Sequence, residues 1–153
     1  MDKGMTKEVM VRIVGQHTGE AVDSEKLASA APGVYYERDD AQYILFEEKA
    51  EGFEETIKSR IKLKDNCLEI NKQGPLNSHM IFQEGMLHNS AYVTPYGRFL
   101  MGIRTKRFAL EEREESLQIQ VDYDLEMDDQ FVAESRIDIF VISADQVRST
   151  SQE

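Results

Sequence analysis

The sequence predicts an all-β protein, an antiparallel up-and-down β-barrel of about eight to ten strands. Three observations support this prediction: apolar and polar residues alternate over long stretches, turn-forming pairs separate these stretches, and almost no segment has helical periodicity. Many antiparallel strands joined by short turns split into a sandwich or close into a barrel, because closure removes exposed edges. Long strands joined sequentially by tight turns favour the barrel.

The alternating stretches predict strands near residues 8–15, 33–38, 42–48, 55–64, 67–72, 78–83, 86–94, 98–107, 116–125 and 131–142. The clearest pattern runs from Leu117 to Leu125, where every odd position is apolar and every even position is polar, as one dry and one wet face require. Residues 20–31 are the exception, because they fit either a short helix or a poorly patterned strand. The conformation of 16–32 is therefore left open.

Pairs of residues that tolerate positive φ predict two-residue turns between consecutive strands. These turns set the registers, which pair Tyr36 with Tyr43 around Asp39-Asp40, Leu63 with Leu68 around Asp65-Asn66, and Phe82 with Leu87 around Glu84-Gly85. The strand at 98–107 is expected to pair with 117–125 across an acidic loop at 110–116. In the last hairpin, a loop at 126–130 would pair Leu125 with Phe131, because this register matches the apolar faces.

Composition and charge exclude several classes of function. The chain has 153 residues, so we expect a single barrel domain over 1–153, with an ordered core at about 8–142 and a loosely ordered tail at 149–153. A formal net charge of −11 argues against binding nucleic acid or an anionic membrane surface. With one cysteine, no recognisable secretory leader and no apolar stretch of about 20 residues, a cytoplasmic protein without disulfides is expected.

The negative charge is concentrated in one part of the chain. Residues 111–138 contain eleven acidic and two basic residues. A separate basic stripe follows one face of the strand at 55–64 and consists of Lys58, Arg60, Lys62 and Lys64. The predicted barrel therefore has an acidic side and a basic stripe elsewhere.

Five residues are candidate ligand contacts. Tyr43 and Glu47 share one side of a strand that ends in two carboxylates, and a buried carboxylate there could anchor a ligand. Tyr96 lies in the turn at 94–97, where it could cap a barrel mouth. Met101 and Tyr123 belong to the apolar face that would line a lumen. A solvated strand end and a plain turn are the alternative interpretations of Glu47 and Tyr96.

No catalytic residue and no metal site is predicted. His79 and His88 would be diagonal neighbours in the Glu84-Gly85 hairpin, but a third ligand is not evident, so we expect them to face outward without a metal. Cys67 follows a turn at the start of a strand, which favours a structural role. The sequence contains no Gly-rich phosphate loop, no catalytic triad order and no HExxH motif.

A series of short motifs runs in order from about residue 33 to residue 142. It consists of Gly33-Val34-Tyr35-Tyr36, 43–48, Thr56-Ile57-Lys58, Gly74, Met80-Ile81-Phe82, 94–97, 101–105 and the strand at 119–125. This series resembles the YwiB-like family of small uncharacterised bacterial proteins. The resemblance implies a calycin-type, lipocalin-like β-barrel and supplies no activity. The chain departs from the family pattern at Asn71-Lys72-Gln73, at Phe46, where tyrosine is common, and at 20–32, a regular strand in relatives.

Two non-enzymatic functions follow from this fold. A barrel with an apolar face rich in methionine and aromatic residues favours a carrier or sensor that binds a small apolar or amphipathic ligand and needs no cofactor. The alternative is a protein-interaction module or homodimer whose barrel is filled by side chains, as the complementary charge stripes indicate. An enzyme is the least favoured function, because no nucleophile, base and orienting group come together.

Overall fold

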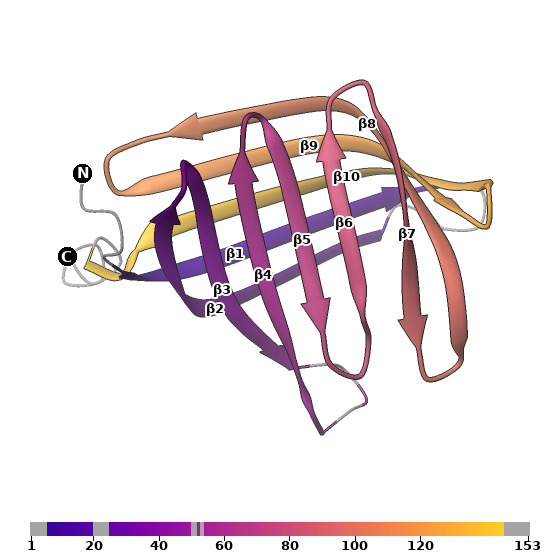
Figure 1. Ribbon diagram of the computed structural model, residues 1–153, viewed down its shortest axis with the longest axis horizontal. Coiled ribbons are helices and arrows are strands. Elements are labelled where there is room, and N and C mark those ends of the chain that lie inside the picture. Colours follow the sequence, from indigo (N-terminus) through magenta and orange to yellow (C-terminus); the bar gives the residue numbers. More distant parts are fainter. Residues whose placement is uncertain (1–5, 20–24, 50–51, 53, 146–153) are drawn as a thin grey trace.

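Ten antiparallel strands of the described chain lie in one sheet and form a nearly closed barrel in the computed structural model (Figure 1). The structure describes residues 6–19, 25–49, 52 and 54–145. The strands are β1 (Lys7–Thr18), β2 (Glu25–Arg38), β3 (Ala41–Lys49), β4 (Thr56–Lys64), β5 (Cys67–Gln73), β6 (Ser78–Gln83), β7 (Leu87–Thr94), β8 (Gly97–Glu112), β9 (Ser116–Met127) and β10 (Gln130–Ser143). Their order is β6-β5-β4-β3-β2-β1-β10-β9-β8-β7, which confirms the predicted antiparallel barrel.

Three hairpins turn on pairs of aspartate or asparagine residues. The two central residues of each turn have φ between 50° and 67°, and the pairs are Asp39-Asp40, Asp65-Asn66 and Asp128-Asp129. Positive φ at both central positions is the requirement of the type I′ turn, whose twist matches that of the flanking strands. The first two turns produce the predicted registers, including Tyr36 opposite Tyr43.

The last hairpin has a different register from the predicted one. The tight turn replaces the expected loop at 126–130, and Leu125 lies opposite Ala133 instead of Phe131. A β-bulge between Phe131 and Ala133 absorbs one residue of the difference. Because the register beyond the bulge is displaced by two residues, the side chains from Ala133 onward keep their predicted face. Phe131, predicted on the same inner face, precedes the bulge and is 57% exposed. Apolar matching therefore could not distinguish the two registers.

Strand β8 is longer than predicted and ends at Glu112, so the acidic loop shrinks to 113–115. A bulge between Thr105 and Arg107 shifts the alternation by one residue. Before the bulge Ile103 is buried in the core, and after it Phe108 packs against the same core. The bulge interrupts the period of two, and this interruption explains why the predicted strand ended at 107 and omitted residues 108–112.

The seam of the barrel lies between β6 and β7, whose predicted ladder is wrong. At one end the backbone of Met86 donates to Gln83 in a tight turn, and at the other end Asn77 pairs with Val93 in an isolated bridge. These two registers differ by one residue, so no continuous ladder can connect them. Phe82 is consequently held at the seam by side-chain packing and by pairing with β5.

Residues 25–32, left open by the sequence, form the first part of β2. This part pairs with β1, whereas the ladder between β2 and β3 stops where Gly33 faces Phe46. Pro32 has no backbone N–H to donate and stands where the ladder ends, as expected for proline beside an unpaired edge. Residues 20–24 and the predicted loose tail at 149–153 lie outside the described residues.

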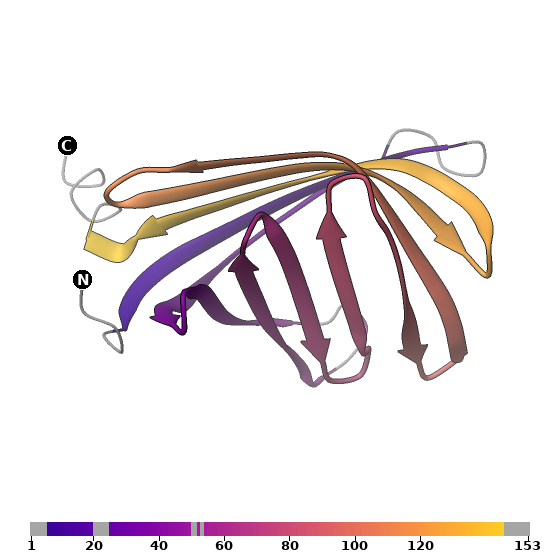
Figure 2. The same ribbon diagram turned by 45° about the horizontal axis from the view of Figure 1, so that its top comes forward.

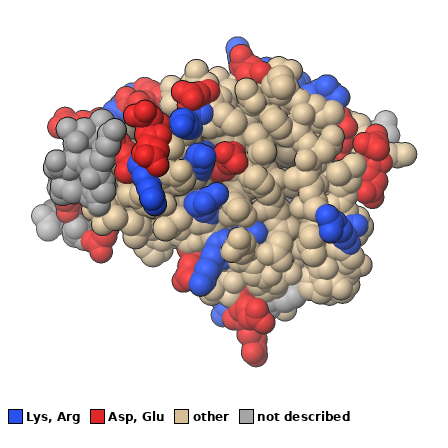
Figure 3. All heavy atoms as spheres, in the orientation of Figure 1, with Lys and Arg blue, Asp and Glu red and all other residues tan. Residues whose placement is uncertain are grey.

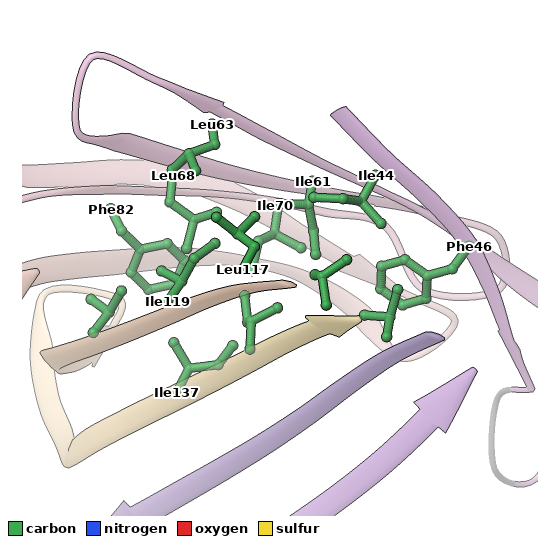
Figure 4. Packing of buried hydrophobic residues seen from close by; sticks show 14 of the residues in the cluster. Ile44, Phe46, Ile61, Leu63, Leu68, Ile70, Phe82, Leu117, Ile119 and Ile137 are labelled. Atoms are coloured by element: carbon green, nitrogen blue, oxygen red, sulfur yellow. The ribbon is translucent and has the colours of Figure 1, made fainter. Parts of the chain in front are cut away.

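Apolar side chains from both halves of the sheet fill the centre of the barrel (Figure 4). Those with 1% or less of their surface exposed are Val11, Ile44, Ile61, Leu68, Ile70, Phe82, Ile103, Ile119, Val121, Ala133 and Ile139. The ring of Phe82 meets that of Tyr123 edge to face, with centroids 5.0 Å apart. Burial of this apolar surface is the main source of stability for such a fold.

The outer face of the barrel carries the charged residues. Figure 3 shows a row of lysine and arginine side chains over β4, where the basic stripe was predicted. Between β9 and β10, Arg136 donates hydrogen bonds of 2.6 and 3.2 Å to Asp122, and this interaction lowers the pKa of the Asp122 carboxyl. Because both side chains contact solvent, the pair contributes less than about 1 kcal/mol. Among the described residues, no helix is long and apolar enough to cross a membrane.

Candidate functional site

A cavity of about 740 Å³ opens at one end of the barrel. The β2–β3 and β8–β9 hairpins, the start of β1 and the end of β10 surround it, on the left of Figure 2. Its volume falls within the roughly 300–1,000 Å³ of typical small-molecule sites. The cavity is therefore the strongest candidate site among the described residues.

The floor of the cavity is apolar and its rim is polar. Val9, Ala41, Leu117 and Val141 line the floor, and each has at most 7% of its surface exposed. Val9, Leu117 and Val141 continue the inward-facing rows of their strands. Ala41 stands at the β2–β3 turn, where it pairs with Arg38. Side chains at the ends of the same rows reach solvent, so polar residues are tolerated there and form the rim.

Tyr35, Glu37, Gln42 and Glu112 form a hydrogen-bonded chain along part of the rim. The phenol oxygen of Tyr35 lies 2.8 Å from Glu37 Oε1 and 3.0 Å from Gln42 Oε1, and it donates its one hydrogen to either acceptor. The amide nitrogen of Gln42 donates to Glu112 Oε1 at 2.6 Å. The chain thus joins β2, β3 and β8 across the cavity.

Local strand geometry explains how these residues come together. Tyr35 and Glu37 are two positions apart on β2 and therefore share a face. Gln42 is two positions before the buried Ile44 on β3. Glu112 turns toward the same side because the bulge in β8 reverses the alternation of the preceding residues.

The surroundings of Tyr35 favour its protonated form. Burial raises the pKa of its phenol, and the hydrogen bond to Glu37 and the charges of Glu37 and Glu112 raise it further. Tyr35 consequently remains a hydrogen-bond donor across the physiological pH range. Its hydrogen is donated within the rim, so the phenol holds the neighbouring acceptors in place, and these acceptors can orient a ligand.

None of the five residues predicted as ligand contacts lines this cavity. Tyr43 lies on the outer face, where its ring stacks on Tyr36 at 4.9 Å. Glu47 is exposed near the end of β3, and Tyr96 is 90% exposed in its turn. Met101 and Tyr123 do face the barrel interior, where both are buried in the core. Ligand binding by these five residues stays a prediction.

Tyr123 belongs to a polar group inside the barrel. Its phenol is hydrogen-bonded to Ser135, whose Oγ lies 2.8 Å from His17 Nδ1. Burial raises the pKa of Tyr123 to about 12, although the bond to Ser135 opposes the shift. The group ties β1, β9 and β10 together within a largely apolar interior.

This pKa predicts a loss of stability at alkaline pH. Below pH 10 the phenol is protonated in both the folded and the unfolded protein, so Tyr123 makes its full contribution to the unfolding free energy. Because the pKa is raised in the folded protein, this contribution is lost as the pH rises to about 12. The unfolding free energy of the wild type should therefore fall by roughly 1–3 kcal/mol more over this range than that of Tyr123→Phe. Urea unfolding followed by circular dichroism, repeated between pH 10 and pH 12, measures how the unfolding free energy of each protein changes with pH. An equal decrease in the two proteins would contradict the prediction.

His79 and His88 each contact a polar side chain, and Cys67 is partly buried. His79 Nε2 lies 2.9 Å from Glu69 Oε1 on β5, and His88 Nε2 lies 3.2 Å from Gln83 Oε1. No group of three or more metal-binding side chains comes together in the part of the chain that the structure describes. Burial raises the pKa of the Cys67 thiol, which keeps it protonated and less nucleophilic at neutral pH.

Sequence reasoning missed the residues that form the rim. Tyr35 was noted only as part of the motif at 33–36 and not as a candidate site residue. Glu112 was placed in the predicted loop at 110–116. A usable signal was present for Tyr35, Glu37 and Gln42, because each polar group continues the inward face of a strand to its end. For Glu112 the alternation gave no such signal, because a bulge precedes it.

Comparisons with known proteins identify the family and the fold. Residues 11–139 match the family described as domain of unknown function DUF1934. The crystal structure of YwiB protein from Bacillus subtilis has a TM-score of 0.79 and 15% sequence identity, and the alignment covers 91% of this chain and 93% of that chain. No curated protein matches the chain. Because the match extends over most of the sequence, this chain belongs to the DUF1934 family, the YwiB-like family that the ordered motifs indicated.

Proposed function

We propose that this protein binds a small amphipathic molecule without transforming it, and that the ligand occupies the cavity at the open end of the barrel. The combination of an apolar floor and a hydrogen-bonding rim supports this function. The apolar part of the ligand would cover Val9, Ala41 and Val141. The polar part would meet Tyr35 and its neighbours at the rim.

The packing of the barrel favours the end cavity over a central lumen. At the centre, side chains such as Ile61 and Ile119 are completely buried and occupy the interior. A ligand placed there would have to displace them and would forfeit close-packed contacts. The end cavity requires no such displacement, so a ligand can bind to the barrel as it is folded.

Titration with a neutral amphipathic fluorophore such as prodan tests this proposal. We expect saturable binding by the wild type, and an affinity at least about tenfold lower in Ala41→Phe, because Ala41 is a buried lining residue and the larger side chain takes up space beside the ligand. Fluorescence emission measures the occupancy. Circular dichroism of the variant establishes that the fold is retained.

Leu45→Phe is the matched control for this titration. Leu45 is on the same strand, but it does not line the cavity and is 40% exposed. The variant should therefore bind the fluorophore like the wild type. Equal binding by Ala41→Phe and Leu45→Phe would place the fluorophore elsewhere, and an absence of binding by the wild type would reject the proposal.

A further inference from the structure

More acidic than basic side chains line the end cavity. Five acidic side chains, Glu37, Asp40, Glu112, Glu114 and Glu115, line it together with three basic ones, Lys7, Arg38 and Arg113. The guanidinium of Arg113 donates to Glu111 at 2.7 and 3.2 Å, and Arg38 Nε lies 3.8 Å from Asp39. Neither Glu111 nor Asp39 lines the cavity, so these two cations are drawn toward carboxylates outside it.

Glu37 and Glu112 receive neutral donors in place of cations. Glu37 accepts from the phenol of Tyr35, and Glu112 accepts from the amide of Gln42. Within the described residues neither carboxylate forms an ion pair with a lysine, arginine or histidine of the chain. A carboxylate can accept hydrogen bonds at several lone-pair positions, so both retain acceptor capacity for a ligand.

The phenol of Tyr35 lies within the field of these two carboxylates. The charges of Glu37 and Glu112 both act on its phenol in the direction that disfavours a second negative charge. Glu37 belongs to β2 and Glu112 to β8, so their fields meet at the rim from two sides of the cavity. The same field attracts a positive head group there.

We propose that the cavity selects an organic cation, a primary ammonium group attached to an apolar chain, with the ammonium held between Glu37 and Glu112. This inference rests on the proposed function and specifies the charge of the ligand. The ammonium has three donors, which can meet the two carboxylates and the carbonyl oxygen of Gln42. The apolar chain extends over the floor at Val9 and Val141.

Isothermal titration with three probes of equal chain length tests the charge preference. The probes are octylammonium, octanol and octanoate, all below the concentrations at which they form micelles. We expect octylammonium to bind at least about tenfold more tightly than octanol, and octanoate to bind least. Glu112→Gln and Glu37→Gln should each reduce the ratio of octylammonium to octanol affinity by at least about threefold.

Asp129→Asn is the matched control for charge. It removes one negative charge, as the two glutamine variants do, but it lies in the β9–β10 turn, away from the cavity lining. Its preference for octylammonium should equal that of the wild type. An equal loss in all three variants would show that only the net charge attracts the cation, and the inference would fail.

The probes distinguish failure of this inference from failure of the proposed function. If octanol or octanoate binds as tightly as octylammonium, and Ala41→Phe abolishes that binding, the cavity binds amphipathic molecules but does not select cations. If none of the three probes binds, the proposed function is rejected together with the inference. Retention of the full preference in both Glu37→Gln and Glu112→Gln would overturn the inference alone.

Discussion

Replacement of Phe82 by alanine is expected to lower the free energy of unfolding by about 3–5 kcal/mol. The ring is fully buried and meets Tyr123 edge to face at 5.0 Å. It also lies on β6, which lacks a continuous ladder with β7. The substitution therefore removes apolar burial, leaves a cavity and loosens the seam at the same time.

Urea unfolding followed by circular dichroism measures this effect, with Phe131→Ala as the control. Phe131 is 57% exposed near the β9–β10 turn, so its truncation should cost less than about 1 kcal/mol. The two variants lose the same atoms and differ in burial. Similar losses in both would mean that Phe82 does not have the buried position described above.

The sequence was sufficient to predict the barrel because the alternation and the turns are local properties. Leu117 to Leu125 alternates without interruption, and Asp65-Asn66 supplies the positive φ that a two-residue turn requires. Each of these signals lies within about ten residues. Closure of the sheet then follows from the need to cover its edges.

Bulges mark the limit of this local prediction. The bulge after Thr105 reverses the inward face of β8, and the bulge after Phe131 accompanies a register displaced by two residues. The pattern of apolar residues is compatible with the wrong register in the second case and is interrupted in the first. Only the partner strands decide these positions, and their contacts are not local.

The same limit explains why the candidate site was only partly foreseen. Met101 and Tyr123 were assigned to the inner face, and both are buried inside. The rim, in contrast, depends on contacts between β2, β3 and β8, such as that of Gln42 with Glu112, which are 70 residues apart. A network of this kind arises from the closure of the barrel and leaves little trace in any single strand.

Substitution of Gly33 by alanine is expected to destabilise the protein by about 1–3 kcal/mol, the usual cost of overpacking. A Cβ at this position would lie 2.7 Å from the backbone oxygen of Leu45 and 3.2 Å from both Phe46 Cβ and Val11 Cγ2. The first of these is a backbone atom, which cannot rotate away. The close approach occurs where the ladder between β2 and β3 ends, so relief of the clash would disturb that ladder.

Gly15→Ala is the control and should change stability in the opposite direction. Gly15 also lies within a strand, β1, but a Cβ there would meet no atom within 4 Å. Alanine restricts the unfolded chain more than glycine does, so this variant should gain about 0.4–1 kcal/mol. Thermal and urea unfolding of both variants measure the difference. Equal changes in stability would mean that the contact with Leu45 does not require glycine at position 33.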